Sequence, residues 1–132
     1  MDGRGIGHAL HGGFAQLVRV PESCLVAVPD GVELEEASIF GCPMGVALRA
    51  LRDVAELQSG ETVLVTGAGG GLGVHAVQIA SAMGATVIAV TTSSDKVERL
   101  ERLGVAEVIL ADELDFSEFA MALTEDRGVD VV

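Results

Sequence analysis

Strands and helices alternate in the second half of the chain, as the spacing of its apolar residues indicates. Residues 62–66 form a near-continuous apolar run, which is typical of a strand buried in a parallel sheet. Apolar residues then recur at helical spacing along residues 72–83, and Gly84 ends that pattern. The alternation continues to the last residue. We therefore expect helices between four strands, at 62–66, 86–91, 107–110 and 129–132.

Two of these helices carry a start signal. Asp95 and Glu98 have the spacing of a capping box, and Asp115 and Glu118 repeat it. Glu98 and Arg102 are also spaced to form an i,i+4 ion pair on the helix surface. This order of strands and helices predicts an α/β fold with a parallel sheet of the Rossmann type. The expected strand order is 3-2-1-4, with right-handed crossovers and helices on both faces.

The first 60 residues show a different pattern. Loose alternation over residues 13–20 and a short apolar run over 25–28 predict two strands. Residues 35–38 favour a helical turn, and helical spacing of apolar residues predicts a helix over roughly 44–57.

The charge of the chain excludes some classes of partner. The formal net charge is −12, and aromatic residues make up 3% of the sequence, so binding to nucleic acid or to an anionic membrane surface is disfavoured. No apolar run approaches the roughly 20 residues of a membrane-spanning helix. Two cysteines are too few for a disulfide framework. We therefore expect a cytoplasmic protein.

Glycines gather in the turn that joins the first predicted strand of the sheet to the first helix. Five of the 17 glycines lie between Gly67 and Gly73. Such a turn lets a ligand approach the backbone closely, and it leads into a helix whose first amides are free to bind a pyrophosphate. The residues expected to bind a dinucleotide here are Thr66, Gly67, Ala68, Gly69, Gly70, Gly71, Leu72 and Gly73.

The same turn also fits the glycine fingerprint of short-chain dehydrogenases. That resemblance covers the turn alone, because some 60 residues precede it here and the chain has no tyrosine to act as their catalytic acid.

A second resemblance covers nearly the whole chain. It rests on residues 12–15, 28–32, 35–37, 60–67 and 128–132, together with the glycine turn. In this register the chain resembles the medium-chain dehydrogenase/reductases, in particular the quinone oxidoreductases, enoyl reductases and zinc-binding alcohol dehydrogenase-like members. The resemblance implies a partial chain, with the end of a GroES-like catalytic domain at 1–43, including a small β segment, and a Rossmann coenzyme domain from residue 44 to 132. It also implies a homo-oligomer for the full-length protein.

The end of the second predicted strand bears on the choice of cofactor. NAD-binding units of this type place a carboxylate there, to hold the ribose hydroxyls. This chain has Thr91, Thr92 and Ser93 instead, followed by Lys96, all suited to a 2′-phosphate. We therefore favour NADP, with NAD as the alternative. The same stretch of residues is also typical of an ordinary helix N-terminus.

Cys42 aligns with a cysteine that binds the catalytic zinc in zinc-dependent members of the family. Zinc-free relatives also carry a cysteine or an apolar residue at this position, and a zinc site needs further ligands. For His75 we expect a packing or solvent-facing role, and His8 and His11 have no evident metal partners.

These observations predict the NADPH-binding part of an oxidoreductase that acts on a quinone, an enoyl group, or a carbonyl or alcohol. The alternative is a dinucleotide-binding module without chemistry of its own. Zinc is a candidate for a second cofactor, and the expected partner is a small-molecule substrate.

Residues 1–132 alone are expected to lack oxidoreductase turnover and either to self-associate or to be only marginally stable. The exposed edge of the fourth strand and the apolar helix that begins at Met44 are the physical reasons. Light scattering that shows a clean monomer, together with NADPH-dependent turnover, would contradict this expectation.

Overall fold

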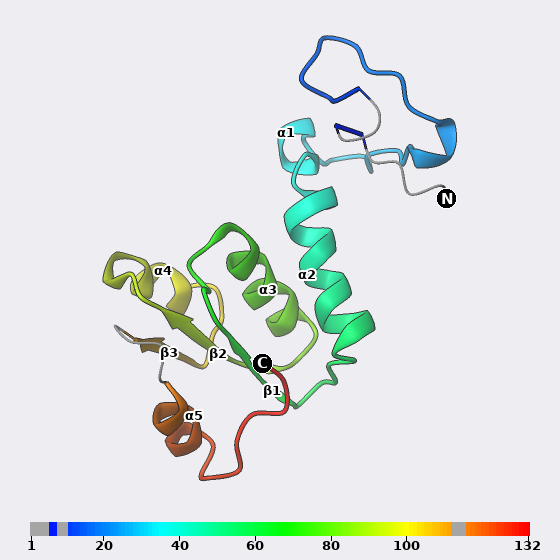
Figure 1. Cartoon of the computed structure of the whole chain (residues 1–132). Helices are drawn as coiled ribbons and strands as arrows, with labels where there is room; N and C mark the ends of the chain where they lie inside the picture. Colours follow the sequence, from blue (N-terminus) through cyan, green and yellow to red (C-terminus); the bar gives the residue numbers. More distant parts are fainter. Residues whose placement is uncertain (1–5, 8–10, 112–115) are drawn as a thin grey trace. The chain divides into compact units, whose positions relative to one another are not determined.

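The computed structural model describes residues 6–7, 11–111 and 116–132 (Figure 1). The chain divides into two compact units, residues 1–32 and 33–132. The sequence predicts a boundary after residue 43 between a GroES-like domain and a Rossmann domain, and that boundary stays a prediction. Among the described residues, no helix has the length and apolar character needed to cross a membrane.

The described part of the first unit contains one 3₁₀ turn, η1 (Glu22–Cys24), and no strand. The strands predicted at 13–20 and 25–28 are therefore wrong. Phe14 is fully exposed, and Leu17 and Val26 are each 91% exposed. A strand needs a neighbour that pairs with it, and no described segment pairs with these residues.

The second unit contains a parallel sheet, as predicted. Its strands are β1 (Thr62–Val65), β2 (Thr86–Thr91) and β3 (Glu107–Leu110). They lie in the order β1-β2-β3 with β2 in the centre, and Val63 pairs with Val87. These strands match the predicted ranges to within one residue, because buried parallel strands leave a continuous apolar run in the sequence.

The last residues lie along the outer edge of β1. Val131 forms a parallel bridge with Val63, and the Leu64 amide donates a hydrogen bond to the Val131 carbonyl at 2.9 Å. The Thr62 amide donates to Asp130 Oδ2 at 2.7 Å. This is the edge that the order 3-2-1-4 assigns to a fourth strand. A single bridge is not a strand, so the complete order stays a prediction.

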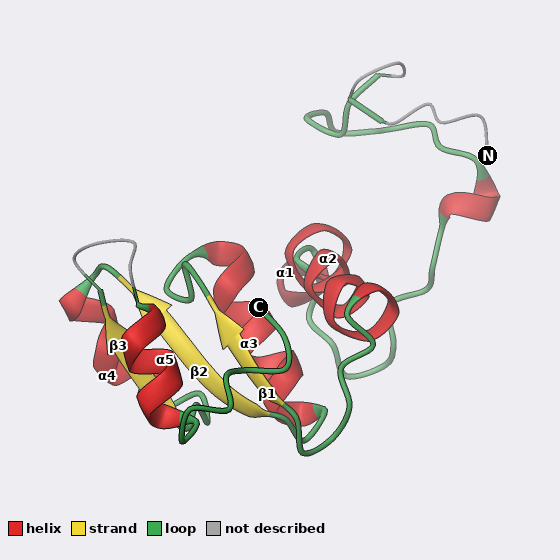
Figure 2. Ribbon diagram, turned by 60° about the horizontal axis from the view of Figure 1, so that its bottom comes forward, coloured by secondary structure: helices red, strands yellow, loops and turns green. Residues whose placement is uncertain are grey.

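Helices cover both faces of the sheet, as predicted (Figure 2). Helices α3 (Gly71–Ala82) and α4 (Val97–Glu101) pack on one face, and α5 (Ser117–Leu123) packs on the other. The first core includes Leu51, Leu57, Val63, Val77, Ala80, Val87 and Leu100. The second core includes Leu64, Ile88, Val90, Ile109, Ala111 and Ala120.

A helical segment precedes the sheet. Helix α1 (Leu34–Ala37) confirms the predicted turn. Helix α2 (Gly45–Arg49) is flanked by π-helical turns η2 (Phe40–Met44) and η3 (Ala50–Val54). The segment thus starts four residues before the predicted helix, because Pro43 is tolerated in a first turn, where its amide is not needed. It ends three residues before the predicted end.

The predicted capping box of Asp95 and Glu98 is wrong. A 3₁₀ turn, η4 (Ser94–Lys96), precedes α4 and places Asp95 inside a helical turn, whereas a capping side chain extends from the residue before the helix. Neither η4 nor α4 receives a side-chain capping bond. The predicted ion pair is confirmed, with Arg102 Nη1 3.4 Å from Glu98 Oε1. Asp115 lies outside the described residues.

Candidate functional site

The turn between β1 and α3 adopts a conformation that favours glycine. Gly67 has a φ of +61°, in the left-handed region that L side chains rarely adopt. The Gly70 amide donates a hydrogen bond to the Gly67 carbonyl at 2.9 Å and closes the turn. The Ala68 amide donates to the Val90 carbonyl at 3.0 Å, which fastens the turn to the end of β2.

Gly73 lets α3 pack directly on this turn. A Cβ atom at Gly73 would lie 2.7 Å from the Ala68 Cα and would also clash with the Gly67 carbonyl oxygen. These neighbours are backbone atoms and cannot move aside as a flexible side chain can. Gly73 and Ala68 are both buried, so they shape the site from below rather than line it.

The start of α3 presents backbone amides that lack a protein acceptor. Among the described residues, the amides of Gly71, Leu72 and Gly73 make no hydrogen bond, and the cap residue Gly70 adds no side-chain bond. The first amides of a helix carry partial positive charge from the helix dipole. This end of α3 therefore suits an anionic group such as a phosphate.

One hollow, which we call the β2 hollow, lies between the glycine turn and the end of β2. Its volume is about 230 Å³. Here the structure brings together two predicted sets of residues that lie more than twenty positions apart in the sequence. The lining residues are Gly67, Gly69, Gly70, Val90, Thr91, Thr92, Ser93 and Lys96.

Two residues of the β2 hollow are more constrained than the sequence indicated. Thr91 is only 4% exposed, and its Oγ1 accepts a hydrogen bond from the Ser93 amide at 3.2 Å. Lys96 Nζ donates to the Gly69 carbonyl at 3.1 Å. A Cβ atom at Gly69 would lie 2.6 Å from Lys96 Cδ, so the lysine chain lies close over this glycine.

A second hollow, the α2 hollow, opens on the other side of the turn. It has a volume of about 210 Å³ and an almost wholly apolar lining. Thr66 and Leu72, both predicted site residues, lie here rather than in the β2 hollow. The other walls come from α2 and from Val131 and Val132, segments that only the fold brings to β1.

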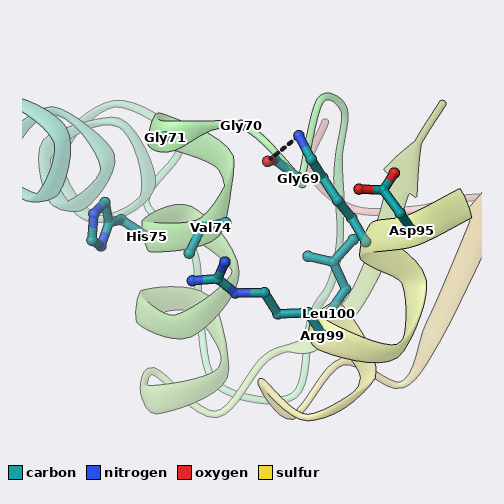
Figure 3. A pocket seen from close by; sticks show the side chains of 9 residues that line it. Gly69, Gly70, Gly71, Val74, His75, Asp95, Arg99 and Leu100 are labelled. Atoms are coloured by element: carbon teal, nitrogen blue, oxygen red, sulfur yellow. Dashed lines mark hydrogen bonds between the residues drawn. The ribbon is translucent and has the colours of Figure 1, made fainter. Parts of the chain in front are cut away.

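A third space, the α3–α4 pocket, lies between α3 and the start of α4 (Figure 3). Its volume is about 460 Å³. His75 is half-buried and belongs to the lining, but Figure 3 shows its imidazole extending from α3 away from Arg99, so its packing or solvent-facing role stays a prediction. Arg99 on the opposite wall was not among the predicted site residues. Its i,i+3 spacing from Lys96 was the available signal.

The remaining candidate residues lie apart from these spaces. Cys42 is exposed in η2, and among the described residues no three His, Cys, Asp or Glu side chains gather as metal ligands. His8 lies outside the described residues. A hydrogen bond from Arg52 lowers the pKa of the Asp53 carboxyl, but both residues are exposed in η3 and line none of the three spaces.

Comparison with known proteins gives related sequences across most of the chain. A family model described as zinc-binding dehydrogenase matches residues 71–132. The chain is 42% identical to an acryloyl-coenzyme A reductase of Sulfurisphaera tokodaii over 98 residues, which are 74% of this chain and 29% of that protein. It is 48% identical to the corresponding reductase of Metallosphaera sedula over 92 residues, which are 70% of this chain and 27% of that protein.

Solved structures agree with this relation. A putative alcohol dehydrogenase from Sinorhizobium meliloti superposes with a TM-score of 0.90 at 36% identity, covering 98% of this chain and 38% of that one. A quinone oxidoreductase of Pseudomonas syringae gives a TM-score of 0.77 at 30% identity, covering 83% of this chain and 34% of that one. The chain thus spans about three tenths of the length of the curated reductases it matches.

The close packing of Gly73 predicts a difference between two neighbouring glycines. Gly73→Ala should lower the free energy of unfolding by about 1–3 kcal/mol, because its methyl group meets backbone atoms. Gly71→Ala is the matched control, since a Cβ atom there meets nothing within 4 Å. Urea unfolding followed by circular dichroism measures both. Equal stability of the two variants would contradict this account of the turn.

Proposed function

This chain belongs to the medium-chain dehydrogenase/reductase superfamily, and we propose from this premise that it binds NADPH as part of an oxidoreductase. The observation that carries the proposal is the row of unpaired amides at the start of α3, directly after the glycine turn. These amides would hold the pyrophosphate of the dinucleotide.

The two hollows beside the turn suit the two halves of such a cofactor. The adenosine half would lie in the β2 hollow, where hydroxyl groups and Lys96 surround the ribose position. The nicotinamide would lie in the α2 hollow, where Leu72 and Val46 offer an apolar wall and Thr66 a hydroxyl group. The glycine turn lies between the hollows and lines one of them, as a pyrophosphate bridging two nucleosides requires.

The preference for NADP rests on the residues at the end of β2. Thr91, Thr92 and Ser93 contain no carboxylate to hold the ribose hydroxyls or to repel a 2′-phosphate. Lys96 adds a positive charge within the same hollow. A preference for NAD is the alternative.

The cofactor supplies a hydride when bound, and the residues of this chain position it and shield it from water. A quinone, an enoyl group or a carbonyl fits as the acceptor, and acryloyl-coenzyme A reductases and a quinone oxidoreductase are among the relatives. These relatives are reductases, which favours an enzyme over a binding module without chemistry. The acceptor would take up the hydride and one proton, which would leave the cofactor oxidised.

The proposal includes no step at a metal. Cys42 stays a candidate zinc ligand, but the described residues do not supply the further ligands that a catalytic zinc requires. We further propose a cytoplasmic location and a homo-oligomeric full-length protein.

Gly70→Val tests the site of the pyrophosphate. Gly70 has φ −89° and ψ 170°, an extended conformation that valine also adopts. A Cβ atom there would lie 3.2 Å from the Gly67 carbonyl oxygen, so the turn must shift slightly, and thermal unfolding is measured to show that the fold persists. The added side chain would occupy the space of the phosphates and weaken NADPH binding at least tenfold in calorimetry. Gly13→Val is the control, since Gly13 lies in the first unit and a Cβ atom there meets nothing within 4 Å. Unchanged affinity in Gly70→Val would place the cofactor elsewhere.

Thr91→Asp tests the preference between cofactors. A carboxylate about 4 Å from the 2′-phosphate costs roughly 1–4 kcal/mol for an effective dielectric between about 80 and about 20. The ratio of NADPH to NADH affinity should therefore fall by about fivefold or more. Thr91→Asn, nearly the same size without the charge, controls for the disturbance of a residue that is 4% exposed. Tighter binding of NADH than NADPH by the unmodified protein would contradict the assignment.

A further inference from the structure

The segment after α5 forms part of the α2 hollow, although it lies outside the helices and strands. Val131 and Val132 line this hollow. Figure 1 shows the segment in red, running from α5 to the edge of β1. Val131 is half-buried against the first core and is joined to β1 by a single bridge. The position of this wall therefore depends on what holds the chain just before it.

A buried hydroxyl group holds the start of the segment. Thr124 follows α5 directly and is only 4% exposed. Its Oγ1 donates a hydrogen bond to the Ala120 carbonyl at 2.8 Å and lies 3.1 Å from the Met121 carbonyl. The same oxygen accepts a hydrogen bond from the Gly128 amide at 3.0 Å. One hydroxyl thus joins the end of α5 to the residue from which the chain continues to β1.

The turn between Thr124 and Gly128 has a strained backbone. Glu125 has a φ of +52° and Asp126 a φ of +61°, in the left-handed region that side chains other than glycine disfavour. Both residues are exposed, so burial of their side chains does not offset this cost. Such conformations persist only where surrounding bonds enforce them. Here the Asp126 amide donates to the Met121 carbonyl at 2.9 Å, and the Thr124 hydroxyl closes the turn.

The far end of the segment is attached to the start of β1. The Thr62 amide donates to Asp130 Oδ2 at 2.7 Å, and the Asp130 amide donates to the Thr62 carbonyl at 2.9 Å. Val129 packs against the second core and Val131 against the first, so the side chains alternate as in a strand. Asp130 fixes where the segment meets β1, and Thr124 fixes the direction from which it arrives.

We propose that Thr124 is a positioning residue for the nicotinamide, because its hydroxyl holds the 128–131 segment where Val131 shapes the α2 hollow. The inference rests on the proposed function, since it assumes that the nicotinamide lies in this hollow. Thr124 does not line the hollow and acts through Val131. Contacts between apolar surfaces weaken steeply when a gap of less than an ångström opens. A shift of the wall would therefore weaken the hold on the ring and leave the phosphates unaffected.

The experiment compares two ligands that differ only in the ring. Calorimetry measures the affinities for NADPH and for 2′-phospho-ADP-ribose, which lacks the nicotinamide. Thr124→Val keeps nearly the same shape without the hydroxyl, and the ratio of the two affinities should fall at least fivefold. Thr124→Ser keeps the hydroxyl and should leave the ratio within twofold of the unmodified protein. A general loss of stability would weaken both ligands equally and leave the ratio unchanged.

A matched control removes a different hydroxyl group. The Ser81 hydroxyl donates to the Gly104 carbonyl at 3.2 Å, and Ser81 lines none of the three spaces. Ser81→Ala should therefore leave the ratio of affinities unchanged.

A second measurement needs no cofactor. The Leu64 amide donates to the Val131 carbonyl, and the Ala106 amide donates to the Val87 carbonyl at 2.8 Å, away from this segment. Hydrogen exchange followed by nuclear magnetic resonance should be at least fivefold faster at Leu64 in Thr124→Val and unchanged at Ala106.

Three results would overturn the inference alone. One is an unchanged ratio in Thr124→Val while the unmodified protein binds NADPH more tightly than the ligand without the ring. Another is an equal fall of the ratio in Thr124→Val and Thr124→Ser. The third is equal acceleration of exchange at Leu64 and Ala106, which would indicate a general loss of stability. If the unmodified protein bound neither ligand, or bound both equally, the proposed function or its placement of the nicotinamide would fail instead.

Discussion

The candidate site depends on one packing constraint, the direct contact of the start of α3 with the backbone of the turn before it. Gly73 has no room for a side chain because the Gly67 carbonyl and the Ala68 Cα occupy that space. This contact aims the first amides of α3 away from the protein's own acceptors. In a chain with a net charge of −12, such a local set of donors is what attracts an anionic ligand, since the overall field opposes it.

The turn also organises the surroundings of the site. It is fastened to β2 through the Ala68 amide, and it separates a polar hollow at the end of β2 from an apolar hollow against α2. The end of β1 and the residues beside Val131 complete the apolar side. A single short turn thus sets the separation between two chemically different spaces, which is the geometry that a dinucleotide requires.

Much of this arrangement could be predicted from the sequence, and the exceptions share a physical cause. Buried parallel strands and a glycine turn leave local signals, so β1, β2, β3 and the turn lie where the pattern placed them. Features that depend on distant partners were wrong or missed. No described segment pairs with residues 13–20, and Asp95 lies within a 3₁₀ turn. Arg99 lines the α3–α4 pocket only because the fold places α4 beside α3.

The most direct test of the central claim is the response of individual backbone amides to NADPH. Nuclear magnetic resonance of the ¹⁵N-labelled protein should show the largest shift changes at Gly71 and Leu72, because a phosphate would accept hydrogen bonds there. Helix α5 packs on the face of the sheet opposite to α3, so the chemical shifts of its amides should stay unchanged. Shift changes that centre on α5, or that leave the start of α3 unaffected, would contradict the account.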